Sequence, residues 1–218
     1  MKAMILCAGR GERMRPLTDH TPKPLLHVHD KALVVWHIEK LASLGFNEIV
    51  INIAHLGNKI AEALGDGSKW GVDIIYSDEQ ESGALESAGG IIKVLPFLGN
   101  ETFLVVNGDI FCDYDFDSGF DLGSDLAHLI LVPNPEHNPN GDFSLADGRV
   151  YNNRDDKFTF SGIGYYSPKL FEGLLCEKSA LAPLLREAIE KERVGGSLHT
   201  GVWHDIGTPQ RLKSINNK

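Results

Sequence analysis

The sequence is poor in cysteine, in basic residues and in long apolar runs. Its three cysteines are an odd number and form no Cys-x-x-Cys pair, which argues against a disulfide framework or a zinc site. The formal net charge of −9 disfavours binding to nucleic acid or to an anionic membrane. No stretch approaches the roughly 20 apolar residues of a membrane span. We therefore expect a reduced, cytoplasmic protein without nucleic-acid or membrane partners, either a monomer or a small homo-oligomer.

Several motifs of well-known protein classes are also missing. The nine histidines form no His-Glu-x-x-His pair, and no Gly-x-Ser-x-Gly element supports a hydrolase. The first glycine loop has Met14 where a Rossmann fingerprint needs its third glycine, and Glu12-Arg13 where Walker A needs Gly-Lys. The alternating acidic run 113–117 lacks the glycine and glutamate of an EF-hand, so we expect an edge strand and loop there.

What is present is a regular alternation of strand-like and helix-like segments. The 218 residues, 42% of them hydrophobic, suit one domain with a sizeable core. Through residue 132 we expect strands at 2–7, 48–53, 72–77, 103–107 and 127–132, and helices at 32–44, 59–64 and 86–95, the last stopped by Pro96. This order predicts an α/β fold, a three-layer sandwich with a mainly parallel, Rossmann-like central sheet.

The second half of the chain has a different pattern. Prolines, asparagines and a glycine between 133 and 141 form a turn-rich link. Beyond it we expect short strands at 143–145, 149–151, 158–166 and 202–205, and helices at 181–191 and 210–216. We interpret this half as a smaller, β-rich part of one domain that spans 1–218.

The first loop has the composition of a phosphate site. Gly9 and Gly11 allow the backbone amides to approach an anion closely, and Arg13 and Arg15 can each offer several N–H groups to phosphate oxygens. Lys23 lies between two prolines that hold the chain extended. The loop predicts a nucleoside triphosphate ligand. The alternative is an ordinary turn with solvated arginines.

Two aspartates are candidate metal ligands. Asp109 ends an apolar strand, and Asp205 follows a strand-like run. Ligands of parallel sheets bind beyond the carboxyl ends of the strands, where the first loop also lies. Magnesium prefers oxygen ligands and takes one or two carboxylates together with substrate phosphates. A turn or a helix cap is the alternative for either aspartate.

Four motifs together resemble the sugar-1-phosphate nucleotidylyltransferase family. The first is Ala8-Gly9-x-Gly11-x-Arg13-Met14-x-Pro16-Leu17-Thr18 followed by Pro22-Lys23-Pro24-Leu25. The later ones are Leu85-Glu-Ser-Ala-Gly-Gly-Ile91, Val106-Asn-Gly-Asp109 and Trp203-His-Asp-Ile-Gly-Thr-Pro209. Gly141-Asp-Phe143 with Phe158-Thr-Phe-Ser-Gly-Ile-Gly-Tyr165 is most similar to the N-acetylmuramate-1-phosphate uridylyltransferase branch.

The resemblance implies a reaction and a division of labour. A sugar 1-phosphate would take the nucleoside monophosphate from a nucleoside triphosphate and release pyrophosphate, with Mg²⁺ as cofactor. The branch implies UTP and N-acetylmuramic acid 1-phosphate, in cell-wall recycling. Mannose 1-phosphate with GTP, glucose 1-phosphate with UTP or dTTP, and a non-catalytic nucleotide-sugar-binding regulatory subunit stay open. Residues 1–132 would mainly bind the nucleotide, and 133–218 mainly the sugar.

The resemblance also implies roles for individual residues. The catalytic residues would be Arg13, Lys23 and Asp109, and the metal ligands Asp109 and Asp205. The nucleotide would be bound by Leu6, Ala8, Gly9, Gly11, Gln80, Ala88, Gly89 and Asn107, and the sugar by Gly141, Asn153 and Gly162. Many members also carry a Glu-Lys-Pro stretch whose lysine meets the sugar phosphate. This chain has Tyr151-Asn-Asn-Arg-Asp-Asp-Lys157 there, so Arg154 and Lys157 are the candidate substitutes. The alternative is that both are loop charges in solvent.

Overall fold

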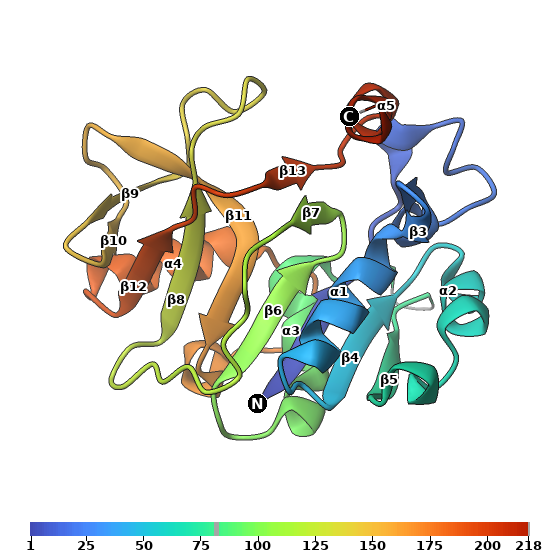
Figure 1. The fold of residues 1–218 in the computed structure, drawn as a ribbon. Coiled ribbons are helices and arrows are strands. Elements are labelled where there is room, and N and C mark those ends of the chain that lie inside the picture. Colours follow the sequence, from blue (N-terminus) through green and yellow to red (C-terminus); the bar gives the residue numbers. More distant parts are fainter. Residues whose placement is uncertain (81–82, 218) are drawn as a thin grey trace.

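The computed structural model describes residues 1–80 and 83–217, and its centre is a nine-stranded sheet (Figure 1). In spatial order its strands are β5 (Asp73–Asp78), β4 (Glu48–Ile53), β1 (Lys2–Leu6), β6 (Phe103–Asn107), β11 (Lys157–Tyr166), β8 (Ala127–Val132), β12 (Val194–Leu198), β10 (Arg149–Tyr151) and β9 (Phe143–Ala146). The first four run parallel, with Met4 opposite Val50 and Val105. The predicted α/β fold is confirmed.

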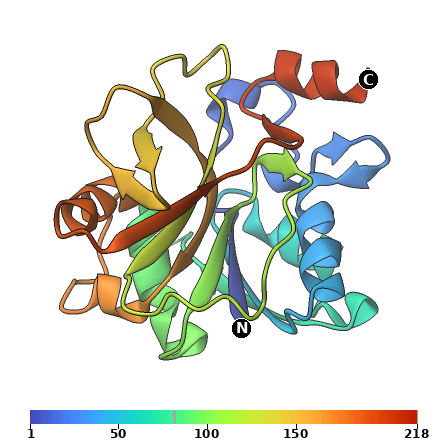
Figure 2. The same ribbon diagram turned by 60° about the vertical axis from the view of Figure 1, so that its left-hand side comes forward.

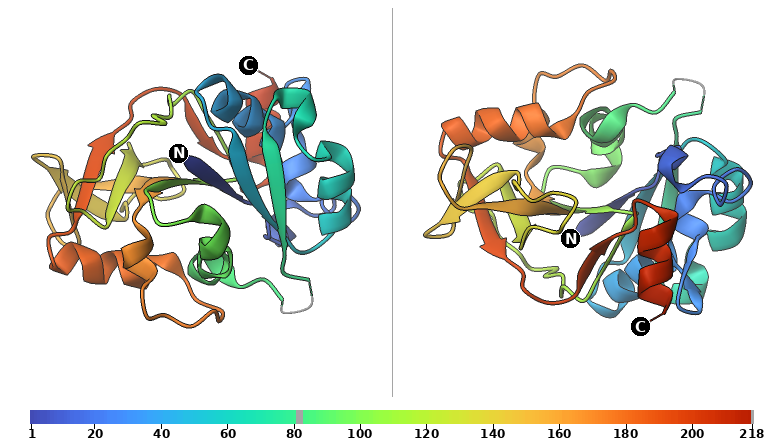
Figure 3. Two further views of the ribbon diagram at one scale, coloured as in Figure 1. Left: turned by 90° about the horizontal axis from the view of Figure 1, so that it is seen from below. Right: turned by 90° about the horizontal axis from the view of Figure 1, so that it is seen from above.

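Helices cover both faces of this sheet, which makes three layers (Figure 3). α1 (Leu33–Ser43) and α2 (Gly57–Leu64) pack on one face, whereas α3 (Glu86–Leu98) and α4 (Leu181–Glu190) pack on the other. Successive side chains of a strand point to opposite faces, so Ile5 joins the α1 side and Met4 the α3 side. Within the described ranges, no helix combines the length and the apolar character needed to cross a bilayer.

Strand β11 joins the two halves of the chain into one sheet (Figure 2). It lies between β6 and β8, antiparallel to both, with Ile163 opposite Val106 and Ile130. Its register shifts between Phe160 and Ile163, and Gly162 in this bulge has a φ of +82°. In this half β8 and β12 run parallel, whereas β9 pairs antiparallel with β10 and β11. The sheet as a whole is therefore mixed.

Short elements are built over the carboxyl ends of the first strands. β2 (His27–Val28) pairs with β3 (Lys31–Ala32), and β7 (Ile110–Cys112) pairs with β13 (Trp203–Asp205). α5 (Pro209–Asn216) follows β13. A small apolar cluster that includes Met14, Leu33, Ile206 and Ile215 packs the first loop against α1 and α5. The first loop and the C-terminal helix therefore meet at this edge of the sheet.

Two expectations about single elements were wrong, and one strand was not foreseen. The acidic run 113–117 forms no edge strand, because β7 ends at Cys112 and a loop follows. Pro96 does not end its helix, because α3 continues to Leu98 and Gly99 then ends it with a φ of +87°. Pro96 has no N–H, so the helix loses one backbone hydrogen bond near its end. The burial of Val94 and Leu98 against the sheet outweighs this loss. Strand β12 was not among the expected strands, and its two glycines, Gly195 and Gly196, are weak strand formers. A β-carbon on Gly196 would lie 2.5 Å from Val150 Cγ2, so the close approach of β10 explains that glycine.

Candidate active site

A cavity of about 560 Å³ opens where β1, β4 and β6 end. Its walls are the loop after β1, the ends of β4 and β6, the start of α3 and the turn before α5. The predicted site residues that line it are Leu6, Ala8, Gly9, Gly11, Arg13, Lys23, Asn107 and Asp109. These come from three separate stretches of the chain. The topology thus brings together residues that the motifs had indicated separately.

The glycine loop is held in a shape that exposes Arg13. Gly11 has a φ of +64° and precedes a 3₁₀ turn, Glu12–Met14. The Thr18 hydroxyl donates a 2.8 Å hydrogen bond to the Gly11 carbonyl, and Met14 is fully buried. Arg13 is exposed at the cavity wall, and no residue in the described part of the chain pairs with its guanidinium. This cation is therefore available to an anionic ligand.

Lys23 and Asp109 form the most closely paired charges of the cavity. The Lys23 Nζ lies 2.6 Å from Asp109 Oδ2. The lysine side chain is 11% exposed and the aspartate 37%. Lys23 begins a 3₁₀ turn, Lys23–Leu25, whose second residue is Pro24. The lysine is thus fixed in place beside the carboxylate that a metal ion would need.

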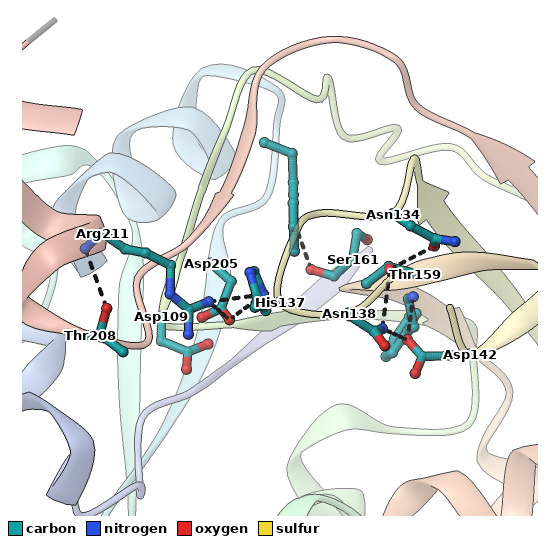
Figure 4. Close-up of polar contacts among 12 residues, drawn as sticks. Asp109, Asn134, His137, Asn138, Asp142, Thr159, Ser161, Asp205, Thr208 and Arg211 are labelled. Atoms are coloured by element: carbon teal, nitrogen blue, oxygen red, sulfur yellow. Dashed lines mark hydrogen bonds and ion pairs between the residues drawn. The ribbon is translucent and has the colours of Figure 1, made fainter. Parts of the chain in front are cut away.

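Asp205 does not line the cavity but comes close to Asp109 from the far end of the chain. β13 pairs antiparallel with β7, which puts Asp205 opposite Ile110, and the Ile206 amide donates to the Asp109 carbonyl at 2.9 Å. Figure 4 shows the two carboxylates side by side. Asp205 Oδ2 lies 2.5 Å from Arg211 Nη1 and 3.2 Å from His137 Nε2.

Sequence reasoning missed both Arg211 and His137. One signal for Arg211 was present: Thr208 followed by Pro209 is a helix-start pattern, and the Thr208 side chain caps α5. That pattern places Arg211 in the first turn of a helix just beyond Asp205. For His137, in the turn-rich link, the sequence offers no comparable signal.

Three of the predicted nucleotide-binding residues, Gln80, Ala88 and Gly89, do not line the cavity. Gln80 is exposed, and its side-chain amide donates to Asp78 Oδ2 at 3.0 Å. The amides of Ala88 and Gly89 donate to the Ser179 carbonyl, and a β-carbon on Gly89 would lie 2.2 Å from the Glu177 carbonyl oxygen. The α3 end of the cavity is instead lined by three residues that sequence reasoning missed, Ala84, Glu86 and Ser87.

A buried relay connects the glycine loop to the start of α3. Asn52 Oδ1 accepts from the Cys7 amide, and Asn52 Nδ2 donates to Glu79 Oε1, each at 2.8 Å. Glu79 Oε2 in turn accepts from the Leu85 amide at 2.8 Å. A β-carbon on Gly90 would lie 2.9 Å from Glu79 Oε1, so the glycine leaves room for this carboxylate. The relay fixes two walls of the cavity relative to one another.

The predicted sugar residues occupy three different surroundings. A β-carbon on Gly162 would lie 2.5 Å from Asn107 Nδ2, so Gly162 adjoins a cavity residue. Gly141 packs against Asn134 and Lys157, and Asn153 is exposed just after β10. None of the three lines the cavity itself.

The turn-rich link is tied to β11 by side chains. Asn134 Oδ1 accepts from the Thr159 hydroxyl at 2.9 Å, and Asn138 Nδ2 donates to the same hydroxyl oxygen at 3.1 Å (Figure 4). Asp142 Oδ2 accepts from the Phe160 amide at 2.8 Å. These bonds hold His137 in front of Asp205.

Two titratable groups beside the site are held neutral. Burial, and secondarily the Asp109 carboxylate, raise the pKa of the Cys7 thiol, which lines the cavity. The thiol therefore stays protonated and is a poor nucleophile. His37 of α1 is buried with Nε2 2.9 Å from the Ile110 carbonyl oxygen, and burial lowers its pKa to about 4. The Ile110 carbonyl and Asp109 oppose this shift, and Lys40 adds to it.

His37 makes the fold sensitive to acid. Between pH 6.5 and 4 the unfolded chain binds a proton that the folded protein does not, so the free energy of unfolding falls as the pH falls through this window. From pH 7.5 to 5 we expect the wild type to lose about 2 kcal/mol more than His37→Gln, measured by urea unfolding. Carboxylates titrate equally in both proteins, so equal losses would contradict this expectation.

A comparison with known proteins identifies the family. A family model described as nucleotidyl transferase matches residues 2–144. The N-acetylmuramate α-1-phosphate uridylyltransferase of Neisseria meningitidis serogroup B is 55% identical over 98% of this chain and 96% of its own length. The UTP–glucose-1-phosphate uridylyltransferase of a Synechocystis species is 38% identical, over 61% of this chain and 36% of its own.

The fold has close relatives among solved structures. A Bacillus anthracis structure with bound sucrose, described as a glucose-1-phosphate thymidylyltransferase, superimposes with a TM-score of 0.87. It covers 100% of this chain and 94% of its own at 21% identity, a likeness that concerns the fold alone. The family-model match and the extent of the Neisseria similarity establish the relationship that the loop motifs indicated. The chain therefore belongs to the nucleotidyl transferase family, among the sugar-1-phosphate nucleotidyltransferases.

Proposed function

We propose that this enzyme transfers uridine monophosphate from UTP to N-acetylmuramic acid 1-phosphate and releases pyrophosphate. The observation that carries the proposal is that Arg13, Lys23 and Asp109 line one cavity, and that β13 brings Asp205 next to Asp109. The choice of substrates is supported by the 55% identity to the Neisseria enzyme over nearly the full length of both chains. UDP-N-acetylmuramic acid would be a cytoplasmic cell-wall intermediate.

The reaction needs charge and position rather than proton transfer. An oxygen of the sugar phosphate forms a bond to the α-phosphorus while the bond to the α–β bridging oxygen breaks, and pyrophosphate leaves with that electron pair. The second pKa of a phosphate monoester is about 6, so the attacking oxygen is ionised at neutral pH without a general base. Arg13 would stabilise the departing pyrophosphate, and Lys23 would orient phosphate oxygens beside Asp109.

The acidic pair fits a divalent cation. Asp109, in the turn before β7, and Asp205, on the adjoining strand β13, supply the hard oxygen ligands that Mg²⁺ prefers. Among the described residues there is no cluster of three or more ligating side chains, so substrate phosphates would complete the coordination shell. When bound, the ion would neutralise phosphate charge. Without the ion, Lys23 balances the negative charge of Asp109, and Arg211 balances that of Asp205.

The two halves of the domain would share the substrates. We assign the nucleotide mainly to residues 1–132, whose glycine loop forms one wall of the cavity. We assign the sugar mainly to residues 133–218. It would contact Gly162, beside Asn107, and the segment around His137, which hydrogen bonds hold against β11. Gln80, Ala88, Gly89, Gly141 and Asn153 keep their assigned roles only as predictions.

Pyrophosphate release tests the proposal directly. The purified protein is incubated with each of UTP, GTP and dTTP against each of the 1-phosphates of N-acetylmuramic acid, glucose and mannose. We expect release with UTP and N-acetylmuramic acid 1-phosphate, and its loss when EDTA removes divalent metal. Release with another combination would show that the proposed substrates are wrong and that the proposed reaction is right. Tight binding without release in any combination would favour a regulatory subunit.

A further inference from the structure

The sugar phosphate needs a cation that the sequence leaves unassigned. Of the two candidates that replace the family's lysine, Arg154 stacks on the Tyr151 ring with its guanidinium carbon 3.4 Å from the ring centroid. Neither Arg154 nor Lys157 lines the cavity. A cation that pairs with Asp205, directly behind the cavity residue Gly207, would meet the phosphate more directly.

Arg211 is such a cation, although it does not itself line the cavity. Its Nη2 would lie 2.5 Å from a β-carbon on Gly207, and Gly207 lines the cavity. Only a residue without a side chain therefore fits between this guanidinium and the cavity. The Arg211 side chain is 25% exposed, so a ligand can reach it.

The Arg211 guanidinium has N–H donors that are not used within the described part of the chain. Its hydrogen bonds within the described part of the chain use Nη1, which lies 2.5 Å from Asp205 Oδ2 and 2.9 Å from His137 Nε2. The Nε and Nη2 groups form the planar fork that matches two oxygens of a phosphate. His137, held by the link to β11, lies against Nη1 from the sugar side and limits how the guanidinium can turn (Figure 4).

We propose that Arg211 binds the phosphate of the sugar 1-phosphate and takes the place of the lysine that this chain lacks. The assignment rests on the proposed function for the identity of the ligand. Asp205 holds the guanidinium at the reaction centre, and a divalent ion on that carboxylate would free Nη1 for the same phosphate. Arg211 is thus a substrate-binding residue on the acceptor side, opposite Arg13 on the nucleotide side.

Steady-state kinetics of Arg211→Gln and Arg211→Lys test this role. Loss of a charged hydrogen-bond donor should raise the KM for the sugar phosphate at least about tenfold in Arg211→Gln and leave the KM for UTP nearly unchanged. Arg211→Lys keeps the charge but loses the fork, so its KM for the sugar phosphate should lie between those of the wild type and Arg211→Gln. Arg154→Gln and Lys157→Gln are the matched controls, and a comparable rise in either instead would overturn the proposal.

Metal binding separates this role from a merely structural one. Titration with Mn²⁺, followed by electron paramagnetic resonance without substrates, should show equal or tighter binding in Arg211→Gln, because a competing cation has left Asp205. Weaker Mn²⁺ binding with a rise in both KM values would mean that Arg211 only positions Asp205, and would overturn the proposal. Arg211→Lys carries the test if Arg211→Gln does not fold.

Calorimetry with N-acetylmuramic acid 1-phosphate distinguishes failure of the inference from failure of the proposed function. If the wild type binds this ligand but turns over no substrate pair, the proposed reaction fails, and loss of binding in Arg211→Gln still supports the assignment. Equal binding by the wild type and Arg211→Gln overturns it. If the wild type neither binds nor turns over any sugar phosphate, both fall.

Discussion

Arg13→Ala is expected to lower kcat for pyrophosphate release at least about a hundredfold, the scale of losing one preorganised charge contact in a transition state. The Arg13 guanidinium lies exposed at the cavity wall, without a partner anywhere in residues 1–80 and 83–217. Its removal therefore breaks no hydrogen bond or ion pair among the described residues, and the thermal midpoint should stay that of the wild type. The loss falls on the bound phosphates, where charge develops as pyrophosphate departs.

Arg15→Ala is the matched control for Arg13. Arg15 belongs to the same loop, but its Nε lies 3.5 Å from Asp19 Oδ1 and the residue does not line the cavity. An exposed ion pair of this kind contributes little to stability, so the variant should fold and turn over much as the wild type does. Equal losses of kcat in the two variants, or near-normal kcat in a folded Arg13→Ala protein, would contradict the role given to Arg13.

Asp109→Asn should also lower kcat at least about a hundredfold, and it should weaken Mn²⁺ binding. Asparagine keeps the shape of the side chain and can still accept a hydrogen bond from Lys23, but it removes the negative charge that a divalent ion requires. Asp205→Asn should weaken Mn²⁺ binding in the same way, since its carboxylate lies on the adjoining strand. Turnover and Mn²⁺ titration are measured on the same preparations.

The control for the acidic pair is Asp113→Asn. Asp113 follows β7 directly, pairs with His199 at 2.9 Å and does not line the cavity. Loss of its charge should leave both kcat and Mn²⁺ affinity close to wild type. Unchanged Mn²⁺ affinity in both Asp109→Asn and Asp205→Asn would remove the basis for a metal site at these carboxylates.

The part of the site that sequence predicted best is local. Gly9, Gly11 and Arg13 belong to one turn, and their roles follow from backbone freedom and charge within a few residues. The prediction for α3 was less successful, although the helix itself was foreseen. Ser87 lines the cavity, whereas the next residues of the helix, Ala88 and Gly89, bond to the Ser179 carbonyl. Each residue turns a helix by about 100°, so a motif match does not decide which neighbour faces a ligand.

By itself the sequence determined the alternation of strands and helices, the shape and charge of the first loop and the family of the enzyme. These depend on periodicity, turn chemistry and short motifs, all of which act over a few residues. Only the tertiary structure decided that Asp205 and Arg211 meet Asp109, because β13 must first pair with β7 across half the chain. It also decided that β11 enters the sheet beside β6, which brings Gly162 against Asn107. Such pairings depend on the packing of the whole fold, and no local pattern encodes them.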